Sequence, residues 1–345
     1  MREKNVGIEL LRLILFFMIV IIHVTSVGIV EQGYGLEFGS NNWIYSIITR
    51  VLAGGAVIGF VLITGYLTAN EEVTTIKKRI IRLLKPFIFY LPIYFILNII
   101  LTNEILTGSI NTIKYLIQIQ GNLYHLWYVI VFLVLMLLIP YINKALKQCT
   151  QLEYKKLIIV LITIVSLLYS LSIILKTYIF YGLFVSRILL FITIYIMGGY
   201  FSKYEIKINK YISLACYIGI GLLMSLMVLR IADYDLQIAT LWQVLEINFV
   251  GVILSALFLF LCFAQFKMKS KFVTFMGNLV YGGYIVHVGY IPMLIKIYNP
   301  FKYVNDNLYW LHNLGFMLII FTCSLVTEMI RKIIFREKLM EAKNK

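Results

Sequence analysis

The sequence predicts an all-α, polytopic membrane protein of about ten transmembrane helices. Of its 345 residues, 61% are hydrophobic and 14% are charged, and the mean hydropathy is +0.90. A soluble domain is about half apolar and about a quarter charged. No alternating pattern typical of membrane barrels is visible, so we expect helices to be the spanning elements.

Ten segments are long and apolar enough to cross a bilayer, which takes about 20 predominantly apolar residues. They are 6–28, 44–68, 84–102, 123–143, 157–175, 179–201, 211–230, 240–264, 272–295 and 309–330. The connecting loops are short, the longest inner one being expected near 69–85, and leave no room for a soluble domain. We therefore expect a single transmembrane domain over 1–335 and a short charged cytoplasmic tail over 336–345.

The charged residues predict the orientation of these spans. With the N-terminus inside, 23 of the 31 lysines and arginines fall on the inner side, five on the outer side and three within spans. This bias places both termini in the cytoplasm. The net charge of +15 is therefore interpreted as orienting the chain and facing anionic lipids or anionic cytoplasmic ligands, and no nucleic-acid partner is expected.

Two residues of the first span have polar or charged side chains that are energetically costly to place inside a membrane. Arg12 and His23 are eleven residues apart, close to three helical turns, so both lie on one face about 16 Å apart along the axis. Glu9 precedes Arg12 by three residues and can pair with it. A charged residue inside a membrane span is a functional hypothesis by default, although an intramembrane pair that pins helices is the plainer alternative.

Three histidines are expected at similar depth in the outer leaflet. His23 and His287 each lie well along a span that enters from inside, and His125 opens the fourth span at its outer end. They could converge on one outward-facing cavity, where imidazole suits proton transfer near neutral pH. His312 is interpreted as an interfacial residue. No carboxylate or cysteine lies at ligand spacing from these histidines, so no metal site is predicted.

Arginines and acidic residues elsewhere leave alternatives open. Arg79 and Arg82 share a helical face at the cytoplasmic level of Arg12, and the three could form an anion site, although a positive-inside anchor explains such runs equally well. Arg50, near the outer end of its span, is expected to extend its head toward water. Arg187 lies deeper, with Glu246 and Glu328 as possible partners. The sequence does not decide the roles of these last four residues.

Several of these segments resemble one known family. Glu9, Leu10, Arg12 and His23 are similar to the opening motif of the acyltransferase-3 family of integral membrane proteins, which modify sugars at the cell surface. Phe60-Val-Leu-Ile-Thr-Gly-Tyr-Leu67 resembles its Phe-Phe-x-x-Ser-Gly-aromatic-Leu motif, with threonine in place of serine.

The later motifs follow in family order. Arg79 and Arg82, followed by Pro86, resemble an Arg-x-x-Arg motif, and His125-Leu-Trp-Tyr128 resembles a His-x-Trp-aromatic motif. Tyr281-Gly-Gly-Tyr-Ile-Val-His287 resembles a late Tyr-Gly-x-Tyr-x-x-His motif, with Gly283 in place of the usual isoleucine or leucine. The ordered set covers most of the chain.

The resemblance implies transfer of an acyl group from acetyl-CoA or a related thioester. His23 would be the base, supported by Glu9, Arg12 and His125, while Arg12, Arg79 and Arg82 would seat the donor. The candidates on the acceptor side are Trp127, Tyr284 and His287. No bound cofactor is expected, because the thioester is a substrate.

The sequence therefore predicts a membrane O-acyltransferase, most plausibly an O-acetyltransferase. Its expected acceptor is a hydroxyl of an envelope or exported polysaccharide, free or lipid-linked, and glycan-assembly proteins are possible partners. A bacterial plasma membrane is the expected location. A transporter or flippase of glycan intermediates is the alternative, disfavoured by the ordered motifs and the lack of a clear internal repeat.

Overall fold

The computed structural model describes residues 5–30, 36–69, 73–102, 125–175, 184–234 and 245–337. Within these ranges the chain is helical, without strands, and nine helical stretches are long and apolar enough to cross a membrane. The predicted all-α polytopic class is therefore confirmed. Residues 338–345, most of the predicted tail, lie outside the described ranges.

Seven of the ten expected spans are single helices within the described residues. They are α1 (Val6–Val30), α4 (Val73–Thr102), α6 (Trp127–Leu146), α7 (Gln151–Ile174), α8 (Phe184–Lys203), α9 (Lys210–Tyr234) and α14 (Tyr309–Ile334). The inner loop expected near 69–85 is wrong, because α4 begins at Val73 and continues through Pro86 and Pro92. Arg79 and Arg82 therefore lie on a helix rather than in a loop.

The second expected span is two helices. α2 (Asn41–Ala53) begins at the N-cap Ser40, whose hydroxyl accepts a hydrogen bond from the Trp43 amide, and α3 (Ala56–Thr68) follows a turn at Gly54–Gly55. A Cβ on Gly55 would lie 3.0 Å from the Cβ of Ala256, so this break lies directly against another helix. The glycine pair thus permits both a break and a close approach.

The ninth and eighth expected spans are also corrected. α12 (Lys271–Gly277) and α13 (Val280–Ile297) are separated at Asn278–Leu279. α11 (Val250–Ala264) is preceded by a turn over 245–249, so the expected continuous helix over 240–264 is wrong in its described part; 240–244 lie outside the described ranges. Such irregular backbone is tolerated at membrane depth only where protein or a cavity surrounds it.

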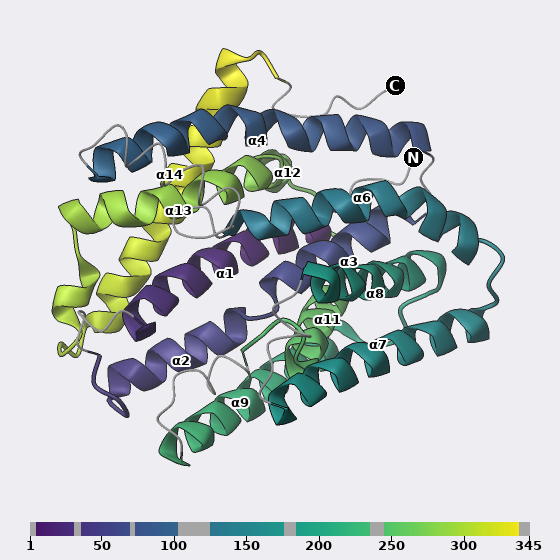
Figure 1. The fold of residues 1–345 in the computed structure, drawn as a ribbon, viewed down its shortest axis with the longest axis horizontal. Coiled ribbons are helices and arrows are strands. Elements are labelled where there is room, and N and C mark those ends of the chain that lie inside the picture. Colours follow the sequence, from purple (N-terminus) through teal and green to yellow (C-terminus); the bar gives the residue numbers. More distant parts are fainter. Residues whose placement is uncertain are drawn as a thin grey trace.

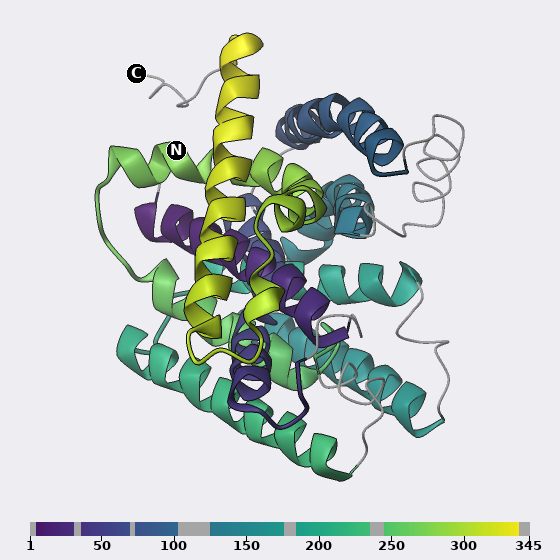
Figure 2. The same cartoon turned by 90° about the vertical axis from the view of Figure 1, so that its left-hand side faces the viewer.

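The helices surround α1. It packs against α2, α3, α11, α12, α13 and α14, while α4 lies along one edge of the bundle and α7 and α9 along the opposite edge (Figures 1 and 2). α3 and α8 approach closely because two glycines at their contact have no side chain. A Cβ on Gly65 would lie 2.1 Å from the Tyr195 carbonyl oxygen, and one on Gly198 would lie 2.2 Å from the Leu62 carbonyl oxygen. Arg12 and His23 are half-buried on the central helix α1.

Candidate active site

Three histidines from separate helical segments meet at one place. The ring centroids of His23 on α1 and His287 on α13 lie 5.0 Å apart. The ring of His125, just before α6, lies 5.4 Å from that of His287 and 6.4 Å from that of His23. The expected convergence of these three side chains is confirmed. His312 lies apart from them, stacked on Tyr303 with centroids 4.0 Å apart.

Backbone carbonyls orient two of these rings. His287 Nδ1 lies 2.5 Å from the Tyr284 carbonyl oxygen, and His125 Nε2 lies 2.9 Å from the Ile285 carbonyl oxygen. A carbonyl only accepts, so each of these nitrogens carries its proton. The lone pair of a neutral His287 is then on Nε2, which is buried and has no hydrogen-bond partner among the described residues. That nitrogen can accept a proton or a hydrogen bond.

Tyr94 on α4 alters the backbone of α13 beside this cluster. Its hydroxyl donates to the Ile285 carbonyl at 2.8 Å and accepts from the Gly289 amide at 3.2 Å. These are the two groups that the i to i−4 pattern of an α-helix pairs with each other. A side chain that inserts into this ladder bends the helix. No sequence motif marks Tyr94, and the one signal of an irregular helix here is the presence of Gly289 and Pro292 within one predicted span.

Tyr284 ties the cluster together from within α13. Its hydroxyl donates to the His125 carbonyl at 2.5 Å, and its ring centroid lies 5.5 Å from that of His287 and 5.8 Å from that of His125. The side chain is 5% exposed. Tyr284 therefore positions two histidines, whereas its expected role toward the acceptor stays a prediction.

The expected pairing of Glu9 and Arg12 is present. Arg12 Nη1 donates to both carboxylate oxygens of Glu9, at 3.0 and 3.1 Å. Glu9 is buried, and the Arg12 side chain is 26% exposed. A Cβ on Gly277 would lie 2.5 Å from a Glu9 oxygen, so the glycine at the end of α12 makes room for this carboxylate. The pair thus holds a guanidinium beside the break in the ninth span.

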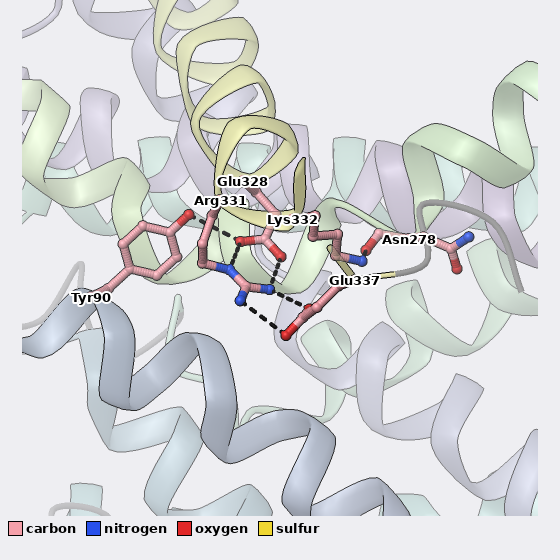
Figure 3. Close-up of polar contacts among 6 residues, drawn as sticks. All are labelled: Tyr90, Asn278, Glu328, Arg331, Lys332 and Glu337. Atoms are coloured by element: carbon pink, nitrogen blue, oxygen red, sulfur yellow. Dashed lines mark hydrogen bonds and ion pairs between the residues drawn. The ribbon is translucent and has the colours of Figure 1, made fainter. Parts of the chain in front are cut away.

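A second pair of the same spacing lies at the end of α14 (Figure 3). Arg331 Nε and Nη2 donate to the two oxygens of Glu328 at 2.7 and 2.9 Å, and the Tyr90 hydroxyl donates to Glu328 at 3.0 Å. Glu328 and Arg331 are almost fully buried. A Cβ on Gly282 would lie 2.0 Å from a Glu328 oxygen, which explains a glycine at this position of the Tyr-Gly motif. The i, i+3 spacing of an acidic residue and an arginine was the missed signal.

Arg82 belongs to this predicted cytoplasmic region. It lies on α4 close enough to Lys332 for the two charges to interact, and Arg79 is half-buried on the same helix. Arg12 is held by Glu9 instead. The joint action of Arg12, Arg79 and Arg82 on one anion therefore stays a prediction.

Three charged groups, Arg50, Glu246 and Arg187, lie between the histidine cluster and Trp127 in a series of pairwise interactions. Arg50 is 9% exposed and lies within electrostatic range of both His23 and Glu246, so the expectation that its head reaches water is wrong. Arg187 interacts with Glu246, which decides between its two possible partners. Its guanidinium lies 4.2 Å from the ring centroid of Trp127, within cation–π distance.

Comparison with known proteins identifies the family of this chain. The family model of an acyltransferase domain matches residues 5–329, nearly the whole chain. The chain belongs to the acyltransferase-3 family. Searches of curated proteins and of solved structures find no match to this sequence.

The family match makes this protein a multi-pass membrane acyltransferase. All five motifs identified in the sequence lie inside the matched range. In this acyltransferase, the first, fourth and ninth spans supply the histidine cluster, and the first and last spans supply the two acidic–arginine pairs.

Proposed function

We propose that this acyltransferase is an O-acyltransferase, specifically an O-acetyltransferase of an envelope or exported polysaccharide in a bacterial plasma membrane. The observation that supports this most is the cluster of His23, His125 and His287, in which backbone carbonyls orient the rings of His125 and His287. Imidazole is the side chain best suited to deprotonating a hydroxyl near neutral pH.

The proposed reaction joins a donor from the cytoplasmic side with an acceptor from outside. His23 takes the proton of the acceptor hydroxyl while the hydroxyl oxygen attacks the carbonyl carbon of the thioester. A carbon–oxygen bond forms, the carbon–sulfur bond breaks, and the leaving thiolate receives the proton that His23 took up. His287, whose ring adjoins that of His23, orients the base, and His125 holds the adjoining backbone.

The donor is proposed to be an acyl-CoA, with acetyl-CoA the leading candidate. Eleven residues of helix separate Arg12 from His23, about 16 Å along the axis. A thioester on a long flexible arm can span this distance while its anionic groups stay near Arg12, Arg79 and Arg82. The arginine fork suits those anionic groups.

A detergent-solubilised assay tests the proposal. The purified protein is incubated with radiolabelled acetyl-CoA and the surface polysaccharide of its host, and ester-linked label on the polysaccharide is measured. We expect label transfer without any sealed membrane. A transporter or flippase would need vesicles, so activity confined to vesicles would contradict the proposal. NMR of the host polysaccharide with and without the gene then identifies the ester and the acceptor hydroxyl.

A further inference from the structure

The chain turns back on itself directly after α14. Arg336 has a positive φ of 50°, a backbone conformation that non-glycine residues rarely adopt. The Glu337 amide donates to the Lys332 carbonyl at 2.8 Å, which closes the turn. This reversal brings the Glu337 side chain back onto the helix it has just left.

Glu337 there acts as a carboxylate ligand of a buried guanidinium (Figure 3). Arg331 Nη1 and Nη2 donate to the two oxygens of Glu337 at 3.2 and 2.8 Å. These hydrogen bonds from Arg331 lower the pKa of Glu337, so its carboxylate is ionised at neutral pH. Glu328 binds the adjacent edge of the Arg331 guanidinium through Nε and Nη2, so the guanidinium keeps its orientation whatever lies in the position of Glu337.

Further cations face the same carboxylate. Lys85 on α4 and Lys332 on α14 both lie within electrostatic range of Glu337, and Arg82 lies within range of Lys332. The Lys332 ammonium donates to the Asn278 carbonyl at 2.8 Å, at the break between α12 and α13. Among these described side chains, four positive charges surround two carboxylates. The result is a basic site in which the carboxylate of Glu337, carried by the C-terminal turn, occupies part of the space between the cations.

We propose that Arg331, Lys332, Lys85 and Arg82 form a phosphate-binding site in which Glu337 is a built-in competitor. The Glu337 side chain is 25% exposed, whereas that of Arg331 is 3% exposed, so the carboxylate can leave while the guanidinium stays. Two oxygens of a phosphate can accept the same pair of hydrogen bonds from Arg331 that the Glu337 carboxylate accepts here. The positive φ of Arg336 disfavours the turn, and the contact between Glu337 and Arg331 offsets part of that cost, so a phosphate that replaces the carboxylate also makes the turn easier to open.

The occupant is a phosphate on the predicted cytoplasmic side, either from the thioester donor or from an anionic lipid headgroup. The assignment to the donor rests on the proposed function. Displacement of Glu337 would then accompany donor binding, and the C-terminal turn would limit donor affinity.

Binding of coenzyme A to the full chain in detergent micelles tests this. Isothermal titration calorimetry compares wild type with Glu337→Gln, and with Glu153→Gln on α7 as a matched exposed carboxylate. If the turn is closed nine-tenths of the time, Glu337→Gln binds coenzyme A about 10-fold more tightly. Pantetheine, which lacks the phosphates, is expected to bind both proteins equally. Equal coenzyme A affinity in wild type and Glu337→Gln, or an equal gain for pantetheine, overturns the proposal.

A second variant and a lipid arm complete the test. Lys85→Gln, with exposed Lys156→Gln as its control, is expected to weaken coenzyme A binding to the Glu337→Gln protein; unchanged binding contradicts the site. If added phosphatidylglycerol removes the gain of Glu337→Gln, the headgroup phosphate fills the site in membranes, and if it does not, the donor does. These binding measurements need no turnover, so a failed acyl-transfer assay would overturn the proposed function while leaving this site intact.

Discussion

The imidazole rings of His23 and His287 lie with their centroids 5.0 Å apart, although they come from the first and the ninth expected spans. His287 is fully buried, and its Nδ1 faces the Tyr284 carbonyl. The His287 ring is thus held in a single tautomer beside His23, which is the base in the proposed function. This relationship leads to the first prediction.

Replacing His23 with alanine is expected to lower acyl transfer by about 10²- to 10⁴-fold, the usual contribution of a general base. His312→Ala is the matched control, because His312 contacts Tyr298 and Tyr303 away from the cluster. Rates are measured with purified protein, and correct folding is checked by its elution as a single species in detergent. Full activity of His23→Ala would contradict the proposed mechanism.

Tyr94→Phe removes a hydroxyl that bonds two backbone groups of α13. Each lost hydrogen bond is worth about 1 kcal/mol, and the backbone that carries His287 is expected to shift. We expect kcat to fall about 10-fold while KM for the donor stays unchanged, because Tyr94 acts through the histidines. Exposed Tyr141→Phe serves as the control. An effect confined to donor KM would rule out this positioning role.

Gly282→Ala is expected to destabilise the protein by ~1–3 kcal/mol, because the added methyl would occupy the position of the Glu328 carboxylate. Gly315→Ala on α14 is the control, since a Cβ there meets nothing within 4 Å. The midpoint of thermal unfolding in detergent reports the difference. Equal midpoints for the two variants would show that Glu328 does not depend on this close approach.

Arg12→Lys keeps the charge but loses the fork that can hold Glu9 and a donor anion together. We expect donor KM to rise about 10-fold, equivalent to ~1.4 kcal/mol. Arg230→Lys on α9, an exposed arginine, provides the comparison. Unchanged donor KM would remove Arg12 from the donor site and leave it as a partner of Glu9.

Arg187→Gln is expected to weaken acceptor binding, because the lost guanidinium no longer holds the ring of Trp127, a candidate residue on the acceptor side. Acceptor KM should therefore rise about 10-fold while donor KM is unchanged. The control is Lys296→Gln, an exposed lysine at the end of α13. A change in donor KM instead would place Arg187 outside the acceptor path.

Much of the fold could be predicted from the sequence because apolar length is a local property. Seven spans are single described helices, and Glu9 pairs with Arg12 as their i, i+3 spacing indicates. The break at Asn278–Leu279 could not be placed, since hydropathy is continuous across it, and the pair Gly54–Gly55 permits either a kink or a close helix approach without deciding between them. Both breaks depend on what packs there, such as Ala256 against Gly55.

The sequence by itself determined the membrane class, the family motifs and the identity of the three histidines. The tertiary structure alone decided which distant groups meet: His23 with His287, Arg187 with Glu246, Tyr94 with the backbone of α13, and Glu337 with Arg331. Local spacing specifies neighbours on one helix, whereas these contacts depend on how separate helices pack. For Arg187 the sequence offered Glu246 and Glu328 equally, and packing placed Glu328 beside Arg331 instead.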